Sequence, residues 1–229
     1  MTPEPSKLPE DFIDTVSHGV RSPLMVITSN AQLIQKVVAG GPHAELVQRS
    51  TADITRSVQR LLGLLDDLVD FYRLQVQEKA SASPRPTLIG ELLAGLVEEA
   101  RRAMGEHELV LEVAPALPEV VADPVLLRRA VQHLLANAAS YPKTDAPIVV
   151  RATAAGRAVR VEVIDRGPGI APEERGAIFE PFRRLPGARG GVGLDLYLVR
   201  RFVEAMSGQV EVQSAPGAGS TFTITLPAA

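Results

Sequence analysis

Before residue 77, apolar residues recur at steps of three and four along two stretches, which is the period of a helix with one apolar stripe. The first stretch repeats at Phe12, Val16, Val20, Leu24, Ile27, Ala31, Ile34 and Val38. The second repeats at Val47, Thr51, Ile54, Val58, Leu61, Leu65, Leu68 and Tyr72. Gly40-Gly41-Pro42 separates them, which predicts a helical hairpin. Because two helices have too little core to stand alone, we expect two hairpins to pair into a dimeric four-helix bundle.

The polar stretch 78–86 contains two prolines, and we expect it to separate a hairpin at 1–80 from a second domain at 85–229. In the second domain the pattern is mixed. Asp123 before Pro124 predicts the N-cap of a helix. The expected helices are 88–104, 124–140 and 194–206, and the expected strands are 108–113, 148–153, 159–164, 209–214 and 220–226. Because these elements interleave without strict alternation, we expect a mixed sheet with helices over one face.

Composition narrows the possible functions. Hydrophobic residues make up 45% of the 229 residues, enough for packed cores. A net charge of −3 argues against nucleic acid as the main partner, and the absence of cysteine excludes disulfides and thiolate metal sites. No apolar run is long enough for a membrane span, and the first residues do not form a signal peptide. We expect a soluble, cytoplasmic chain, with any membrane or sensory segment of the natural protein outside this sequence.

The strand expected at 159–164 ends on Asp165, which is followed by Gly167 and Gly169. This places a carboxylate at a strand end beside a backbone that a flat ligand can approach closely, since glycine has no Cβ. Such a carboxylate can accept a hydrogen bond from an exocyclic amine, as on adenine. Taken alone, the pattern is equally typical of an ordinary strand-to-loop turn.

His18 lies on the side of its predicted helix opposite the apolar stripe. A solvated surface histidine is the simplest interpretation of that position. However, Pro23 cannot donate a hydrogen bond to the carbonyl of Gly19, so a kink is expected just past the histidine. An exposed histidine beside a distorted backbone favours a functional role.

Three further segments could complete a nucleotide pocket. Asn137 interrupts an apolar helical run, and its amide oxygen could bind Mg²⁺, although a helix-surface asparagine would look the same. Arg183 and Arg184 follow Phe179-Glu-Pro-Phe182 and could contact phosphates. Gly190-Gly-Val-Gly193 precedes a helix whose free N–H groups could bind an anion. The chain has no P-loop, and Leu196 occupies the third glycine position of a dinucleotide fingerprint.

In this order, segments 17–24, 137–138, 165–169, 179–182 and 191–194 resemble the H, N, G1, F and G2 boxes of two-component sensor histidine kinases. The resemblance implies a dimerisation and histidine-phosphotransfer hairpin followed by an α/β sandwich, the Bergerat ATP-binding fold. It implies that His18 is the phosphoacceptor, with Ser22 at a position used in phosphatase activity, and that Asn137 binds Mg²⁺. The implied ATP-binding residues are Asn137, Tyr141, Asp165, Gly167, Gly169, Ile170, Phe182, Arg184, Gly191, Gly193 and Leu194.

The implied function is a protein histidine kinase that transfers the γ-phosphoryl group of Mg-ATP to His18 and then to an aspartate of a response-regulator receiver domain. The alternative is a pseudokinase, a dimeric nucleotide-sensing scaffold that binds a receiver domain with little kinase activity. Gly19 stands where the family usually has an acid that acts as base for the imidazole. The other departures from the family pattern are Ser22, His133, Ser140, Val192 and Asp195.

Overall fold

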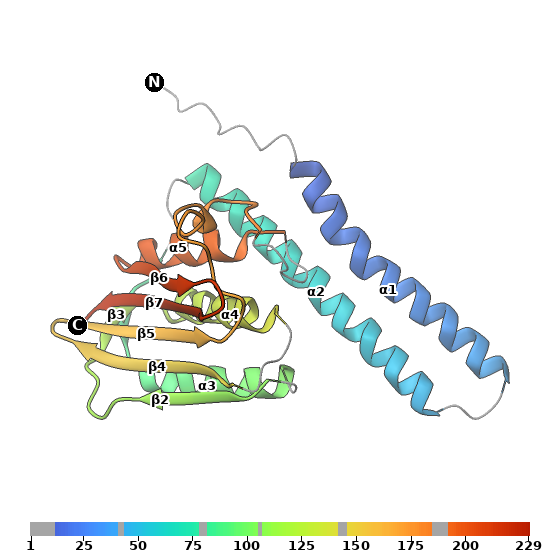
Figure 1. Ribbon diagram of the computed structural model, residues 1–229, viewed down its shortest axis with the longest axis horizontal. Coiled ribbons are helices and arrows are strands. Elements are labelled where there is room, and N and C mark those ends of the chain that lie inside the picture. The colour runs from blue at the N-terminus through green and yellow to red at the C-terminus, as the bar shows by residue number, and fades with distance from the viewer. Residues whose placement is uncertain (1–11, 41–43, 78–81, 105–106, 142–145, 185–191) are drawn as a thin grey trace, which may run out of the picture. The chain divides into compact units, whose positions relative to one another are not determined.

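The computed structural model describes residues 12–40, 44–77, 82–104, 107–141, 146–184 and 192–229 (Figure 1). The chain divides into two compact units, Met1–Gln75 and Val76–Ala229, and each is described by itself. The first unit is helical, and the second combines strands with helices.

The first unit is the helical hairpin that the sequence predicts. Helix α1 spans Phe12–Gly40 and helix α2 spans Ala44–Gln77, with the chain reversing direction between them (Figure 1). Helix α1 continues through Pro23. Because proline has no N–H, the carbonyl of Gly19 lacks its usual intrahelical donor in the turn that follows His18.

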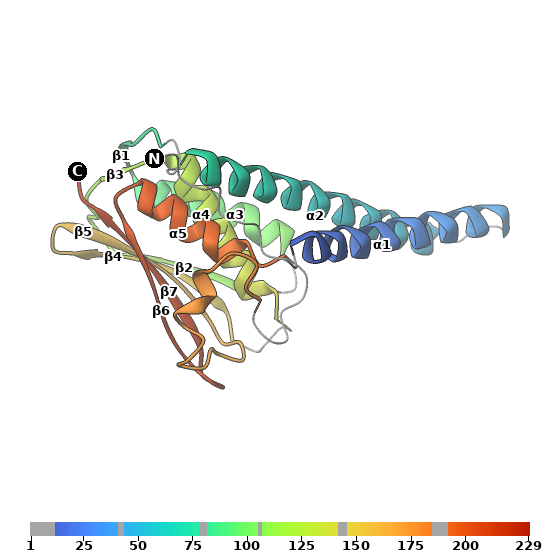
Figure 2. The same ribbon diagram turned by 90° about the horizontal axis from the view of Figure 1, so that it is seen from above.

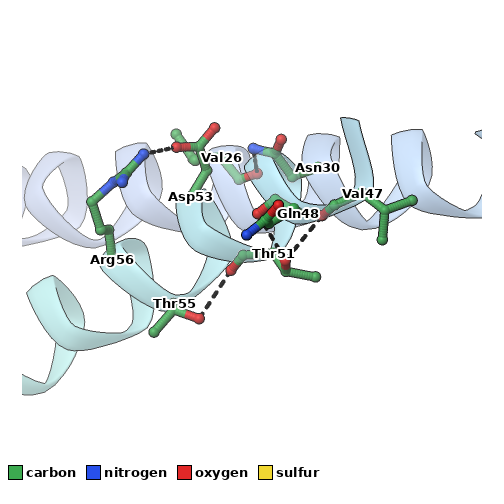
Figure 3. A network of polar contacts seen from close by, with 8 residues as sticks. All are labelled: Val26, Asn30, Val47, Gln48, Thr51, Asp53, Thr55 and Arg56. Carbon is green, nitrogen blue, oxygen red and sulfur yellow. Dashed lines mark hydrogen bonds and ion pairs between the residues drawn. The ribbon is translucent and has the colours of Figure 1, made fainter. Parts of the chain in front are cut away.

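Several polar side chains of the hairpin form hydrogen bonds or ion pairs within their own helices (Figure 3). The bonds run from Asn30 to the carbonyl of Val26 (3.0 Å), from Thr51 to the carbonyls of Val47 and Gln48 (both 2.9 Å) and from Thr55 to the carbonyl of Thr51 (2.9 Å). Arg56 forms an ion pair with Asp53 one turn before it. Such local bonds lie within one helix and do not join one helix to another.

An apolar stripe on α2 is exposed in the single chain. Its members are Val58, Leu62, Leu65, Val69 and Tyr72, at steps of four, three, four and three, whereas the predicted seam continues from Val58 with steps of three, four, three and four. Leu62 and Val69 belong to this stripe, whereas the predicted members Leu61 and Leu68 are half-buried. Residues 61 and 62 are both leucine, so periodicity alone could not decide which of the two faces outward.

The second unit contains a five-stranded sheet in the order β2-β4-β5-β7-β6. The strands are β2 (Leu109–Val113), β4 (Ile148–Ala155), β5 (Ala158–Asp165), β6 (Gln209–Ala215) and β7 (Gly219–Pro227). Strand β2 runs parallel to β4 and the remaining pairs are antiparallel. Helices α3 (Ile89–Ala103), α4 (Pro124–Ala139) and α5 (Asp195–Ala205) cover one face of the sheet (Figure 2). The expected mixed sheet with helices on one face is therefore confirmed.

The core lies between this sheet and its helices. On β5, every second side chain is buried, at Val159, Val161 and Val163, as expected for a strand with one covered face. The buried residues of α4 recur with a helical period and are Leu127, Ala130, Val131, Leu134, Leu135 and Ala138. This packing fixes the last turn of α4 and the end of β5, and both carry candidate site residues.

The N-cap predicted at Asp123 is confirmed and has a second role. Asp123 Oδ1 accepts hydrogen bonds from the backbone N–H groups of Val125 (2.8 Å) and Leu126 (3.2 Å). Its Oδ2 accepts from the N–H of Ser83 (2.8 Å), which ties the start of this unit to α4.

A second, two-stranded sheet was not predicted. It pairs β1 (Arg85–Thr87) with β3 (Val120–Ala122), and β1 begins inside the stretch expected to be a linker. A three-residue strand that contains Pro86 carries too little alternation to be detected from sequence. A short 3₁₀ helix, Ala177–Phe179, also lies outside the predicted elements.

Candidate functional site

Asp165 is the last residue of β5, and its side chain is buried, with the residue only 6% exposed. Burial raises the pKa of its carboxyl group, whereas backbone hydrogen bonds from Gly167 and Ser220 and the charge of Arg166 lower it. The Gly167 N–H donates to Asp165 Oδ1 over 2.7 Å. The carboxylate is therefore held in one orientation by the protein itself, at the end of the strand where the sequence predicted a base-binding acid.

The loop after Asp165 packs directly against the turn between β6 and β7. Gly169 has φ +73°, and a Cβ built there would lie 1.9 Å from the carbonyl oxygen of Ala215. Gly219 has φ +80°, and its Cβ would lie 2.1 Å from the carbonyl oxygen of Asp165. Since L-residues rarely adopt this backbone region, any side chain at either position would both strain the backbone and force the two segments apart.

Gly167 lies in close contact with the side chains of Asp165 and Tyr141. A Cβ at Gly167 would lie 2.9 Å from Asp165 Oδ1 and 3.5 Å from Tyr141 Cδ2. Burial raises the pKa of the Tyr141 hydroxyl, and the nearby charges of Asp165 and Glu174 raise it further. Tyr141 therefore remains a neutral group around physiological pH, beside a carboxylate that only accepts hydrogen bonds when ionised.

Asn137 lies half-buried in the last turn of α4. Its backbone carbonyl accepts hydrogen bonds from the N–H (3.1 Å) and the hydroxyl (2.7 Å) of Ser140. Ser140, which differs from the residue usual in the family, thus caps the C-terminus of α4 between Asn137 and Tyr141. Asn137 offers an amide oxygen, a ligand type that Mg²⁺ accepts in proteins.

The start of α5 is in close contact with the segment after the 3₁₀ helix. Gly193 has φ +79°, and a Cβ there would lie 2.6 Å from the carbonyl oxygen of Arg183. Phe182 also has a left-handed backbone, at φ +63°, which costs a non-glycine residue about 1–2 kcal/mol. Leu194, directly before α5, is fully buried. These contacts fix where both flanks of segment 185–191 attach to the rest of the unit.

The structure thus brings one predicted group together, formed by Tyr141, Asp165, Gly167, Gly169 and Ile170. It also brings together a second group, formed by Phe182, Gly193 and Leu194. Ser22 and Arg184 are exposed. Gly191 and the side chain of His18 lie outside the described part of the chain.

The sequence did not predict a contact between two of the residues that depart from the family pattern. His133 Nδ1 lies 3.1 Å from Asp195 Oδ1, and this hydrogen bond joins α4 to the first turn of α5. The two residues are 62 positions apart, so only the topology of the domain shows that they meet. Sequence reasoning also missed Ser214 and Ser220, whose hydroxyls lie 3.0 Å apart beside Asp165. Their strands were predicted, but the register that aligns them with Asp165 was not.

Two family models match this chain. Residues 10–77 match the His Kinase A (phospho-acceptor) domain, and residues 122–229 match the histidine kinase-, DNA gyrase B- and HSP90-like ATPase. The mycobacterial sensor histidine kinase MprB, a solved structure, is 30% identical, with a TM-score of 0.57 over 64% of this chain and 98% of that one. The chain belongs to the sensor histidine kinase family. The resemblance and the fold class that it implied are therefore confirmed.

Longer relatives match nearly the whole of this histidine kinase chain. The sensor-like histidine kinase SenX3 of Mycobacterium tuberculosis is 32% identical over 95% of this chain and 53% of its own length. The sensor protein TorS of Escherichia coli is 33% identical over 94% of this chain and 24% of its own. The chain therefore spans about half or less of the length of these curated relatives. Within the described residues, no helix has the length and apolarity needed to cross a membrane.

Two solved structures extend the comparison to both units. Full-length ShkA in complex with AMPPNP is 30% identical, with a TM-score of 0.67 over 97% of this chain and 47% of that one. Histidine kinase ThkA in complex with the response regulator protein TrrA has a TM-score of 0.68 over 96% of this chain and 62% of that one. Its identity of 20% limits that likeness to the fold.

Proposed function

We propose that this chain is an ATP-dependent protein histidine kinase that phosphorylates itself on His18 and then phosphorylates an aspartate of a response-regulator receiver domain. The observation that carries the proposal is the buried carboxylate of Asp165, held in one orientation by the Gly167 N–H at the end of β5. It occurs in a chain whose residues 10–77 match a phospho-acceptor domain. A receptor for adenine and an acceptor for phosphate are the two parts that this reaction needs.

In the proposed ATP complex, Asp165 accepts a hydrogen bond from the adenine amine, and the base lies beside Tyr141 and Gly167. Gly169 and Ile170 shape the wall of this pocket. The phosphates extend toward the N-terminus of α5, where backbone N–H groups favour an anion. The residues proposed around them are Phe182, Arg184, Gly191, Gly193 and Leu194.

The donor set at the end of α4 fits Mg²⁺. The amide oxygen of Asn137 is a hard ligand, half-buried one turn before Tyr141, and Mg²⁺ commonly combines a few such protein ligands with waters and phosphate oxygens. When bound there, the ion would neutralise charge on the phosphates. Asn137 itself would orient the ion through one oxygen.

Phosphoryl transfer needs little covalent chemistry from the protein. A ring nitrogen of His18 forms a bond to the γ-phosphorus while the bond from that phosphorus to the bridging oxygen breaks, releasing ADP, and the imidazole loses its N–H proton to solvent water. The ring nitrogen without a hydrogen carries the lone pair that forms the new bond to phosphorus. The phosphoryl group then passes to a receiver carboxylate, and Ser22, an exposed residue, is proposed to assist dephosphorylation.

Gly19 removes the acid that would accept the imidazole proton in related kinases. Loss of a general base slows a reaction by about 10²-fold. The proposed kinase is therefore slow, and a pseudokinase that binds nucleotide and a receiver domain without phosphorylating itself is the alternative that an experiment must separate from it.

The proposed kinase is a homodimer. The exposed stripe on α2 presents Leu62 at 56% and Tyr72 at 70% exposure, and its steps of three and four match the seam of a helical bundle. Burying such a stripe yields roughly 25 cal/mol per Å² of apolar surface. A second copy supplies the same stripe in a symmetric arrangement.

Incubation with γ-labelled ATP tests the function. The chain should acquire label that is stable to alkali and lost in acid, as a phosphoramidate is, and the His18→Gln variant should acquire none while still binding ATP. Transfer of that label to a receiver domain would establish the second step. Nucleotide binding without label in the wild-type chain would favour the pseudokinase instead.

A further inference from the structure

Three side chains form a polar row at the ends of three adjacent strands. Ser220 on β7 pairs with Asp165 on β5 and also with Ser214 on β6. Paired residues of antiparallel strands point to the same face of the sheet. Asp165 lies two residues after the buried Val163, so both side chains point to the same face of β5. This row therefore lies on the face that the helices cover, where the proposed function places the base of the nucleotide.

The hydroxyl of Ser214 makes three short contacts, and together they determine which partner is the donor in each. A serine hydroxyl has one hydrogen to donate and two lone pairs that accept. The carbonyl oxygen of Gly219 lies 2.7 Å from Ser214 Oγ and can only accept, so it takes the hydrogen. The Ile170 N–H donates to the same Oγ over 2.8 Å and uses one lone pair.

One lone pair of Ser214 remains for Ser220, whose Oγ lies 3.0 Å away. Because Ser214 has no second hydrogen, Ser220 must be the donor in this bond. The hydroxyl of Ser220 is thereby oriented with its hydrogen toward Ser214, and only lone pairs are left to face a ligand. The ionised carboxylate of Asp165 also offers only acceptors.

A row that offers only acceptors distinguishes purines by the group at position 6. Where position 6 of the purine faces this row, a 6-amino group presents an N–H donor, whereas a 6-oxo group presents an oxygen that would face other lone pairs. A ligand whose polar atom finds no partner in a buried site loses affinity for that reason.

We propose that Ser214 is a specificity-determining positioning residue: it orients the hydroxyl of Ser220 so that the site selects 6-amino over 6-oxo purine nucleotides. This inference rests on the proposed binding of ATP at Asp165. Without the Ser214 hydroxyl, Ser220 is free to rotate and donate to a 6-oxo group. A merely structural role for Ser214 would change the affinity for both nucleotides by the same factor.

Dissociation constants of the full chain for ATP and for inosine triphosphate, which carries a 6-oxo group, test the proposal. Ser214→Ala should reduce the preference for ATP by roughly fivefold, the scale of one hydrogen bond. Ser214→Thr, which keeps a hydroxyl, should retain the preference. Ser220→Ala should also reduce it, because the oriented acceptor is gone. Thr221→Val, one residue along β7 and therefore on the opposite face, is the matched control and should leave the preference unchanged.

Equal weakening of both nucleotides in Ser214→Ala, or no change in either, would overturn the proposal. Full discrimination in Ser220→Ala would overturn it as well, and that variant decides the question if Ser214→Ala does not fold. Failure of the wild-type chain to bind ATP would contradict the proposed function instead, so the two failures are distinguishable.

Discussion

At the scale of single residues, the site is built around an acid that the fold makes costly to ionise. Burial is the main influence on Asp165 and raises the pKa of its carboxyl group, although two backbone N–H groups oppose the shift. A group whose pKa is higher in the folded state stabilises the fold at low pH. That contribution is lost as the pH rises through the folded-state pKa. The ionised carboxylate therefore reduces the stability of the nucleotide-free chain at neutral pH. The proposed contact with adenine requires this same ionised form.

Asp165→Asn should separate binding from stability. The amide keeps the shape of the side chain but cannot ionise, so the nucleotide-free variant should melt at a higher temperature than the wild type at pH 8, and the difference should shrink as the pH is lowered through the raised pKa of Asp165. Its affinity for ATP should fall by roughly tenfold or more, as expected when a hydrogen bond to a charged group is lost. Thermal unfolding and calorimetric titration would measure the two effects. A stability difference independent of pH would contradict the assignment of the raised pKa.

At the scale of elements, the contact between the Asp165–Gly169 loop and the β6–β7 turn determines the shape of the proposed pocket. Neither segment belongs to a helix, and each relies on glycines with left-handed backbones at the point of contact. The N–H of Gly217 also donates to the carbonyl of Pro168 over 2.7 Å. A change in one segment should therefore be transmitted to the other.

Gly169→Ala should weaken ATP binding far more than a matched change in another turn. Gly156, in the β4–β5 turn, has φ +63°, and a Cβ there would meet no heavy atom within 4 Å, so Gly156→Ala introduces only the left-handed strain of about 1–2 kcal/mol. Gly169→Ala adds a collision with the carbonyl of Ala215. Thermal unfolding and ATP titration of both variants would compare them. Equal effects on ATP affinity would show that the loop contact does not shape the pocket.

The elements of this chain differ in how far the sequence could predict them. Periodicity located the long helices and the strands near 148–164, because repeated burial of one face leaves a regular pattern. It could not find β1 and β3, whose three residues each show no period. It also could not find the bond between His133 and Asp195 or the row of Asp165, Ser220 and Ser214. Those contacts depend on strand register and on helix packing, which link positions far apart in the sequence.

At the scale of the whole molecule, the exposed stripe on α2 differs from the solvated helix faces of a typical monomer. Apolar side chains scattered singly over a surface are normal, but a continuous stripe at helical spacing marks an interaction site. The family match at residues 10–77 agrees with a role for this hairpin in a larger assembly. Association of two copies is the arrangement that covers the stripe of each with the same surface of the other.

Replacing Leu62 and Leu65 together with glutamate should convert the dimer to a monomer at micromolar concentration, because the change places charges within the apolar seam. Val125→Glu is the control, since Val125 is 63% exposed on α4 and outside the hairpin. Sedimentation equilibrium would give both masses. A wild-type chain that already sediments as a monomer would contradict the proposed dimer.

The rate of labelling from γ-labelled ATP in Gly19→Glu, compared with the wild type, tests the central claim most directly. The glutamate restores a carboxylate beside His18 and also favours the helix by about half a kcal/mol or more. Gly63→Glu makes the same helix-favouring change in α2, where a Cβ meets no neighbour within 4 Å, and controls for it. We expect slow labelling of the wild type and of Gly63→Glu, and labelling about 10²-fold faster in Gly19→Glu. A Gly19→Glu chain that binds ATP but labels no faster than the wild type would contradict the account.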